Sequence, residues 1–219
     1  MTKVINLRNI KKHNLNLKNS NSIKNTDKIH LKNDIYIIIF TIISIVSIIL
    51  GCIIYKNFKI DVISELCINL ITQIQSKSFI TILISYLKID TLYFILLFFF
   101  GSSALGLPLT FIPIIFKSVF IGYMSSFIYN EYSLKGTLFC IVLLFPIYTI
   151  TTTSLIYSAN ESIYMSKYIF NLMKNINTAD NISVRLYLIR NGFLFIINIL
   201  SIVIMSLFAM VITNKITLV

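Results

Sequence analysis

Long apolar runs that lack charged residues constrain the fold more than any other feature of the sequence. Residues 35–55 contain no Asp, Glu, Lys or Arg, and residues 91–129 contain only Lys117. A helix needs roughly 20 apolar residues to cross a bilayer core of about 30 Å, and lipid satisfies no backbone polar group. With 57% hydrophobic residues, a soluble domain is excluded. The sequence predicts an all-α, polytopic transmembrane helical bundle with about five spans.

The segment before the first run has a different composition. Residues 1–34 carry eight basic residues against Asp27 and Asp34, and they are rich in Asn. Such a composition is typical of a flexible, solvated tail. The tail is expected either to set membrane topology alone or also to bind anionic lipid. Nucleic acid is not an expected partner, because no binding fold accompanies the charge.

The block 91–129 is too long for a single crossing, because its 39 residues would form roughly 58 Å of helix. Gly106, Leu107 and Pro108 supply a break: glycine can adopt the left-handed conformation that ends a helix, and proline suits the first turn of the next one. The sequence therefore predicts a helical hairpin and a membrane domain over 35–219. The expected spans are about 35–55, 91–106, 108–129, 137–158 and 192–212.

The distribution of basic residues predicts the orientation. Cytoplasmic loops collect Lys and Arg. With a hairpin and a cytoplasmic amino terminus, twelve basic residues lie inside and six outside. A single kinked span would give a weaker bias, so the hairpin is favoured.

Lys117 is a charge inside a predicted span. No Asp or Glu lies within any predicted span, so the ammonium is expected to bond either the Leu109 carbonyl, which Pro113 leaves free, or the hydroxyls of Thr149–Ser154. An intramembrane charge is a functional-site hypothesis by default. The two interpretations are a snorkelled depth anchor and a role in packing or partner binding.

Two further patterns concern helix packing. Ser118, Gly122 and Ser126 recur every four residues and let another helix approach closely, either within the monomer or in an oligomer or partner seam. Pro146 lies mid-span and is followed by threonines that can satisfy freed backbone groups, which predicts a stable kink. A substrate cavity beside this broken helix is the alternative.

The outer segment 56–90 predicts two amphipathic helices that lie in the membrane interface or cover the bundle. Their apolar positions fall near a 3.6-residue period. In the first helix, which is a candidate for partner docking, they are Ile60, Ile63, Leu66, Leu70 and Ile74; in the second they are Phe79, Ile82, Leu83, Tyr86 and Leu87.

Catalytic, metal and cofactor sites find no support in the sequence. Both histidines lie in the tail, the three cysteines are far apart, and no catalytic or nucleotide-binding motif is present. Asp61 and Glu65 lack a third metal ligand. Cys52 follows "ILG", which is an atypical lipoprotein box, so a plain thiol is expected there.

The hairpin and the following span resemble the stage II sporulation protein M (SpoIIM) family. The resemblance rests on "FGSSALGLPLTFIPIIFKSVFIGYMSSFI" and "LLFPIYTI", together with the single amino-terminal span, the outer amphipathic stretch and the chain length. It covers roughly residues 35–213.

The resemblance implies a non-enzymatic membrane scaffold in the sporulation septum. Its implied partners are SpoIIP-like and SpoIID-like peptidoglycan-degrading proteins. The basic tail and the small-residue pattern add membrane lipids and a second copy of the chain as further expected partners. The competing hypotheses are a permease or channel subunit that uses Lys117 and the proline-broken helices, and a membrane protein of the wider family outside sporulation.

Overall fold

The structure is a computed structural model that describes residues 35–75, 78–174 and 184–213. The predicted basic tail, residues 1–34, lies outside the described residues. The chain divides into two compact units, residues 1–39 and residues 40–219. Of the first unit, only the helical residues 35–39 are described, so the packing below concerns the second unit.

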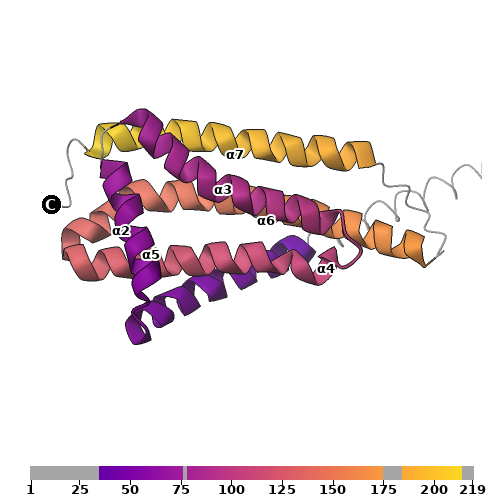
Figure 1. Cartoon of the computed structure of the whole chain (residues 1–219), viewed down its shortest axis with the longest axis horizontal. Coiled ribbons are helices and arrows are strands. Elements are labelled where there is room, and N and C mark those ends of the chain that lie inside the picture. Colours follow the sequence, from indigo (N-terminus) through magenta and orange to yellow (C-terminus); the bar gives the residue numbers. More distant parts are fainter. Residues whose placement is uncertain (1–34, 76–77, 175–183, 214–219) are drawn as a thin grey trace, which may run out of the picture. The chain divides into compact units, whose positions relative to one another are not determined.

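The described residues are all-α, and no strand occurs among them, which confirms the predicted fold class. The helices are a first helix at Ile35–Asn57, α2 at Asp61–Gln75, α3 at Phe79–Gly101, the short α4 at Gly106–Leu109, α5 at Phe111–Phe139, a π-helical stretch at Cys140–Leu144, α6 at Phe145–Met173 and α7 at Val184–Thr213 (Figure 1).

Four stretches of helix are long and apolar enough to cross a membrane: Ile35–Asn57, Phe79–Gly101, Gly106–Met173 and Val184–Val211. The third stretch is 68 residues long and is interrupted at Ser133, where φ is 48° and ψ is −127°. A positive φ is uncommon for a non-glycine residue and breaks the helix here. The chain folds back there, so α5 and α6 run side by side in opposite directions (Figure 1) and five passes result.

The surface of this bundle is that of a membrane protein. Large apolar side chains stand exposed along the spanning helices, among them Ile42, Ile45, Phe193, Ile196 and Leu200, each more than half exposed. Contiguous exposed apolar surface of this extent is unusual for a soluble monomer. The chain is therefore membrane-embedded.

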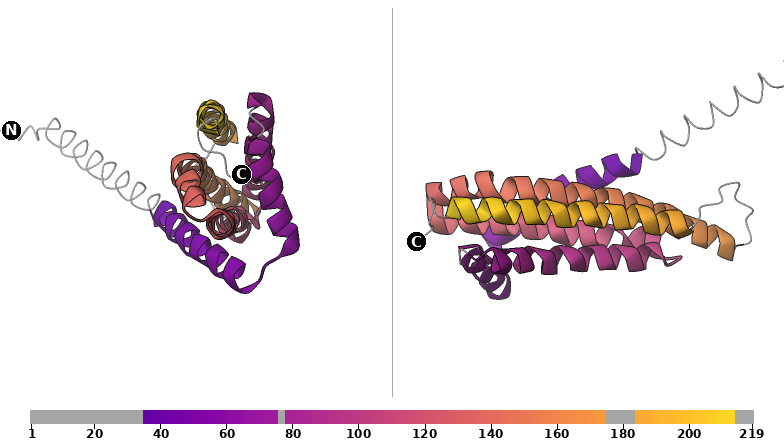
Figure 2. Two further views of the ribbon diagram at one scale, coloured as in Figure 1. Left: turned by 90° about the vertical axis from the view of Figure 1, so that its left-hand side faces the viewer. Right: turned by 90° about the horizontal axis from the view of Figure 1, so that it is seen from above.

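Within the second unit, α3, α6 and α7 pack against one another, and α6 and α7 lie side by side over most of their length (Figure 2). Helix α2 is set across the spanning helices and contacts α3, α5 and α7 (Figure 1). Its buried side chains, Cys67, Ile71 and Ile74, join the main apolar cluster of the bundle. This confirms an amphipathic helix in the outer segment.

Several helices are longer than the sequence predicts. The second predicted amphipathic helix is not separate, because Phe79–Leu87 forms the first turns of α3. Helix α6 continues to Met173, and α7 begins at Val184 rather than at residue 192. Lys167, Arg185 and Arg190, which the sequence predicts to lie between spans, lie on these helix extensions.

Candidate functional site

A buried ion pair joins helix α3 to helix α5. The Lys117 ammonium donates a hydrogen bond to Asp90 Oδ1 at 2.6 Å, and the side chains are 2% and 8% exposed. Asp90 lies on α3 and Lys117 on α5. The ammonium also lies 5.9 Å from the centre of the Tyr93 ring, near enough for a cation–π contact.

This pairing corrects the expected surroundings of Lys117. The sequence predicts no carboxylate within a span, and hence a bond from Lys117 to the Leu109 carbonyl or to the hydroxyls of Thr149–Ser154. The expectation was wrong because α3 begins at Phe79, so Asp90 lies near the middle of a spanning helix and not ahead of one. The sequence signal was present, since Asp90 is the only acidic residue between Glu65 and Glu131.

Very little free space surrounds the pair. The cavity beside it has a volume of about 10 Å³, and Tyr86, Ile121, Met124 and Tyr148 are among the residues that line it. This is about the space of one water molecule. The pair is therefore a packed element of the bundle.

The turn between α3 and α5 lies at 102–105, a few residues before the predicted break, because Gly106, Leu107 and Pro108 belong to helix α4. Helix α3 ends at Gly101, the Ser102 N–H donates to Phe98 O, and the Gly106 N–H donates to Ser103 O. No described glycine has a positive φ, so Gly106 does not adopt the expected left-handed conformation.

Gly106 is required by space instead. A Cβ at this position would overlap the Phe100 carbonyl oxygen and would stand 3.0 Å from Ser166 Oγ on α6. Leu107 and Pro108 follow within α4, and Pro113 is buried in the first turn of α5, where a missing N–H costs least.

Pro146 lies at the start of α6, directly after the π-helical stretch Cys140–Leu144. The irregularity is therefore a π-bulge before the proline, which is one of the recognised causes of a bent helix. The Thr149 hydroxyl donates to Pro146 O at 2.9 Å and the Thr153 hydroxyl to Thr149 O at 2.7 Å. The threonines thus bond carbonyls within α6 itself.

Of the three small residues on α5, Gly122 lies against the first helix. A Cβ on Gly122 would overlap the Ile48 carbonyl oxygen, and a Cβ on Gly51 would overlap that of Val119. The Cys52 thiol donates to Gly122 O at 3.4 Å. Ser118 is fully buried, and Ser126 is partly buried. The two glycines let the helix backbones touch within one chain.

The predicted docking positions of the outer helix do not share one face. Ile74 is fully buried, and Ile63 and Leu70 are packed against the main apolar cluster. Ile60 and Leu66 are exposed, as are Phe58 and Val62. Ile74 is therefore a core residue and is unavailable to a partner.

Sequence reasoning missed a set of polar contacts between α3, α6 and α7. The Ser158 hydroxyl donates to Asn191 Oδ1 at 2.5 Å, and the Ser162 hydroxyl donates to Leu97 O at 3.2 Å. The Tyr187 hydroxyl lies 3.3 Å from Ser162 Oγ. Such bonds join helices in lipid, where apolar burial supplies little driving force.

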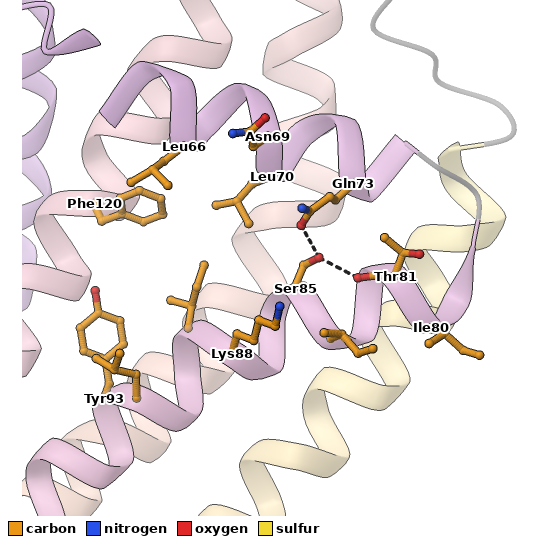
Figure 3. Close-up of a pocket in the computed structure, with 13 residues that line it drawn as sticks. Leu66, Asn69, Leu70, Gln73, Ile80, Thr81, Ser85, Lys88, Tyr93 and Phe120 are labelled. Atoms are coloured by element: carbon orange, nitrogen blue, oxygen red, sulfur yellow. Dashed lines mark hydrogen bonds between the residues drawn. The ribbon is translucent and has the colours of Figure 1, made fainter. Parts of the chain in front are cut away.

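A groove opens between α2 and α3, with a volume of about 680 Å³ (Figure 3). Most of its walls are apolar, and Lys88 is the one charged residue among those that line it. The groove shares Leu70, Ile89, Tyr93 and Phe120 with the small cavity beside the ion pair. The groove therefore borders the small cavity that Asp90 and Lys117 line.

The structure offers no metal site within residues 35–75, 78–174 and 184–213, since no three His, Cys, Asp or Glu side chains gather there. Comparison with known proteins adds no assignment: no protein-family model, curated protein or solved structure matches this chain.

Proposed function

We propose that this chain is a non-enzymatic membrane scaffold of the SpoIIM type, which holds septal peptidoglycan hydrolases during engulfment in endospore formation. The proposed partners are SpoIIP-like and SpoIID-like proteins. The proposed location is the sporulation septum of the cell membrane, with a cytoplasmic amino terminus.

The observation that carries this proposal is the buried ion pair between Lys117 and Asp90. A permease or channel of the kind considered above would depend on Lys117. This lysine is paired at 2.6 Å and enclosed by side chains, with about 10 Å³ of free space. A transport site needs a hydrated or exchangeable cavity. A charge that is sealed into the packing favours a rigid framework.

The residues that carry the family resemblance also serve packing. Gly106 and Gly122 are positions where two backbones touch or nearly touch, and Lys117 joins α5 to α3. These contacts hold the hairpin between α6 and the first helix. A scaffold of this kind uses such a framework to present a docking surface.

The surface proposed for docking is the outer patch, which consists of Phe58, Ile60 and Val62. These residues precede and begin α2, and they are 69%, 39% and 69% exposed. In the proposed orientation the outer patch faces the wall compartment, where the hydrolases act. Apolar exposed residues of this kind are typical of interaction sites.

Deletion of the gene in the host, followed by microscopy of sporulating cells, tests the proposal. Septal wall thinning and engulfment should stall, and the wild-type chain should restore both. An affinity pull-down from sporulating cells should recover a peptidoglycan hydrolase with the wild-type chain. Normal engulfment in the deletion strain, or solute flux through vesicles that contain only this protein, would sink the proposal.

A matched pair of variants locates the docking surface. Val62→Gln changes the outer patch, whereas Leu134→Gln changes an exposed residue, 81% accessible, beside the turn at Ser133. Both side chains lie on the same proposed side of the membrane. Recovery of the hydrolase should fall with Val62→Gln and stay unchanged with Leu134→Gln.

A further inference from the structure

The groove between α2 and α3 combines an apolar channel with a single cation. Leu66, Leu70, Ile84 and Leu92 belong to its walls, and Figure 3 shows Leu66 and Leu70 among them. Its volume of about 680 Å³ lies within the range of small-molecule sites, which is roughly 300–1,000 Å³. An occupant must therefore be largely apolar.

Lys88 gives the groove its charge. It lies on the spanning helix α3, nine residues from the first residue Phe79, which corresponds to about 14 Å of helical rise. Its side chain is exposed, and it forms no salt bridge with any residue that the structure describes. No acidic residue lines the groove.

The direction of Lys88 indicates where a counter-charge would lie. In Figure 3 its side chain extends along α3 toward Ser85, that is, toward the amino-terminal end of the helix. A lysine within a span directs its ammonium toward the membrane surface in this way. Near Ser85 the groove is polar, because the Ser85 hydroxyl bonds Gln73 Oε1 and Thr81 O.

We propose that this groove binds an anionic phospholipid, with an acyl chain along the apolar walls and the headgroup phosphate on the Lys88 ammonium. The lining favours an anionic occupant, because Lys88 is positively charged and no carboxylate lines the groove. The position selects a lipid over an acidic peptide, since the exposed Ile80, Ile84 and Leu92 belong to the spanning surface of α3. Hydrocarbon is the solvent at that surface.

Titration of the purified full-length protein in detergent, followed by native mass spectrometry, tests the lipid site. The probes are dioleoyl phosphatidylglycerol and dioleoyl phosphatidylcholine, which share acyl chains and differ in net charge. The wild-type protein should bind phosphatidylglycerol about fivefold more tightly, which is the effect expected of one lysine near a headgroup.

Four variants separate the effect of charge from an effect on the fold. Lys88→Met should remove the preference for phosphatidylglycerol and leave the binding of phosphatidylcholine unchanged, whereas Lys88→Arg should retain the preference. Lys135→Met removes an exposed lysine near the turn at Ser133 and should retain the preference as well. Ile84→Trp narrows the groove and should weaken both lipids. Circular dichroism and size-exclusion profiles establish that each variant is folded.

Equal affinities for the two lipids in the wild-type protein would overturn the proposal. So would a preference that survives Lys88→Met, or one that disappears with Lys135→Met. Displacement of bound phosphatidylglycerol by a soluble acidic peptide would instead assign the groove to a protein partner. If Lys88→Met does not fold, the Ile84→Trp variant decides. Affinities for both lipids equal to those of the wild-type protein would then overturn the proposed site. These outcomes do not depend on a role in sporulation.

Discussion

Asp90 and Lys117 lie opposite one another across the hairpin, with their charged atoms 2.6 Å apart. Each is twelve residues from the turn at 102–105. In an antiparallel helical hairpin, residues equally far from the turn lie at the same depth. The pair therefore forms in only one alignment of α3 against α5. A shift of either helix along its axis would leave a buried charge without its counter-ion.

The first prediction concerns the free energy of unfolding that this pair controls. Asp90→Leu or Lys117→Met alone should destabilise the protein by about 3–5 kcal/mol, because each leaves an uncompensated buried charge. The double variant should recover most of this loss, since it buries no charge. Reversible unfolding in mixed micelles, followed by circular dichroism, measures the effect. A double variant as unstable as the single ones would show that the charges are not the cause.

The second prediction contrasts two glycines in spanning helices. Gly122→Val should destabilise the bundle by about 1–3 kcal/mol, because its side chain would overlap the Ile48 carbonyl oxygen of the first helix. Gly192→Ala should be neutral or stabilising by up to about 1 kcal/mol, because nothing lies within 4 Å of an added Cβ and alanine favours the helix. The same unfolding assay compares them, and equal losses would refute the close crossing.

The third prediction concerns the reactivity of Cys67 on α2. The thiol is buried, and burial raises its pKa from 9.0 to about 12. A raised pKa keeps the thiol neutral as the pH rises, and only the thiolate attacks maleimides. Cys67 of the folded protein should therefore label slowly between about pH 7 and 10, and labelling should become fast after denaturation. Peptide mass spectrometry reads the rate.

An introduced thiol supplies the control for Cys67. Leu134 is 81% exposed, so Leu134→Cys should label rapidly in the folded protein. Comparable labelling rates at positions 67 and 134 would contradict the burial of α2 against the bundle.

The fourth prediction is the orientation in the membrane. Single cysteines at positions 75, 107 and 133, in a chain without its native cysteines, should be accessible from outside, inside and outside respectively. The reason is that the turn at 102–105 and the turn at Ser133 end successive passes. Impermeant maleimide on intact cells, compared with lysed cells, reads the sides. A reporter after residue 175 that faces the exterior would reverse the assignment.

The boundaries of the spans cannot be predicted from local hydropathy alone. Lys88 and Asp90 delay the predicted second span to residue 91, yet α3 already begins at Phe79. Asp90 is tolerated inside the helix because Lys117 neutralises it, and Lys88 lies on the exposed side. Both compensations come from tertiary position, which a hydropathy window does not contain.

The sequence by itself determined that this chain is an all-α membrane protein that folds back near Gly106–Pro108. Apolar length and the backbone limits of glycine and proline are local properties, and they act wherever those residues lie. Only the tertiary structure decided that Asp90 pairs with Lys117, that Gly51 and Gly122 meet, and that a groove with one cation opens between α2 and α3. These features depend on helix rotation and depth, which are fixed by the packing of all helices together and by no single stretch of residues.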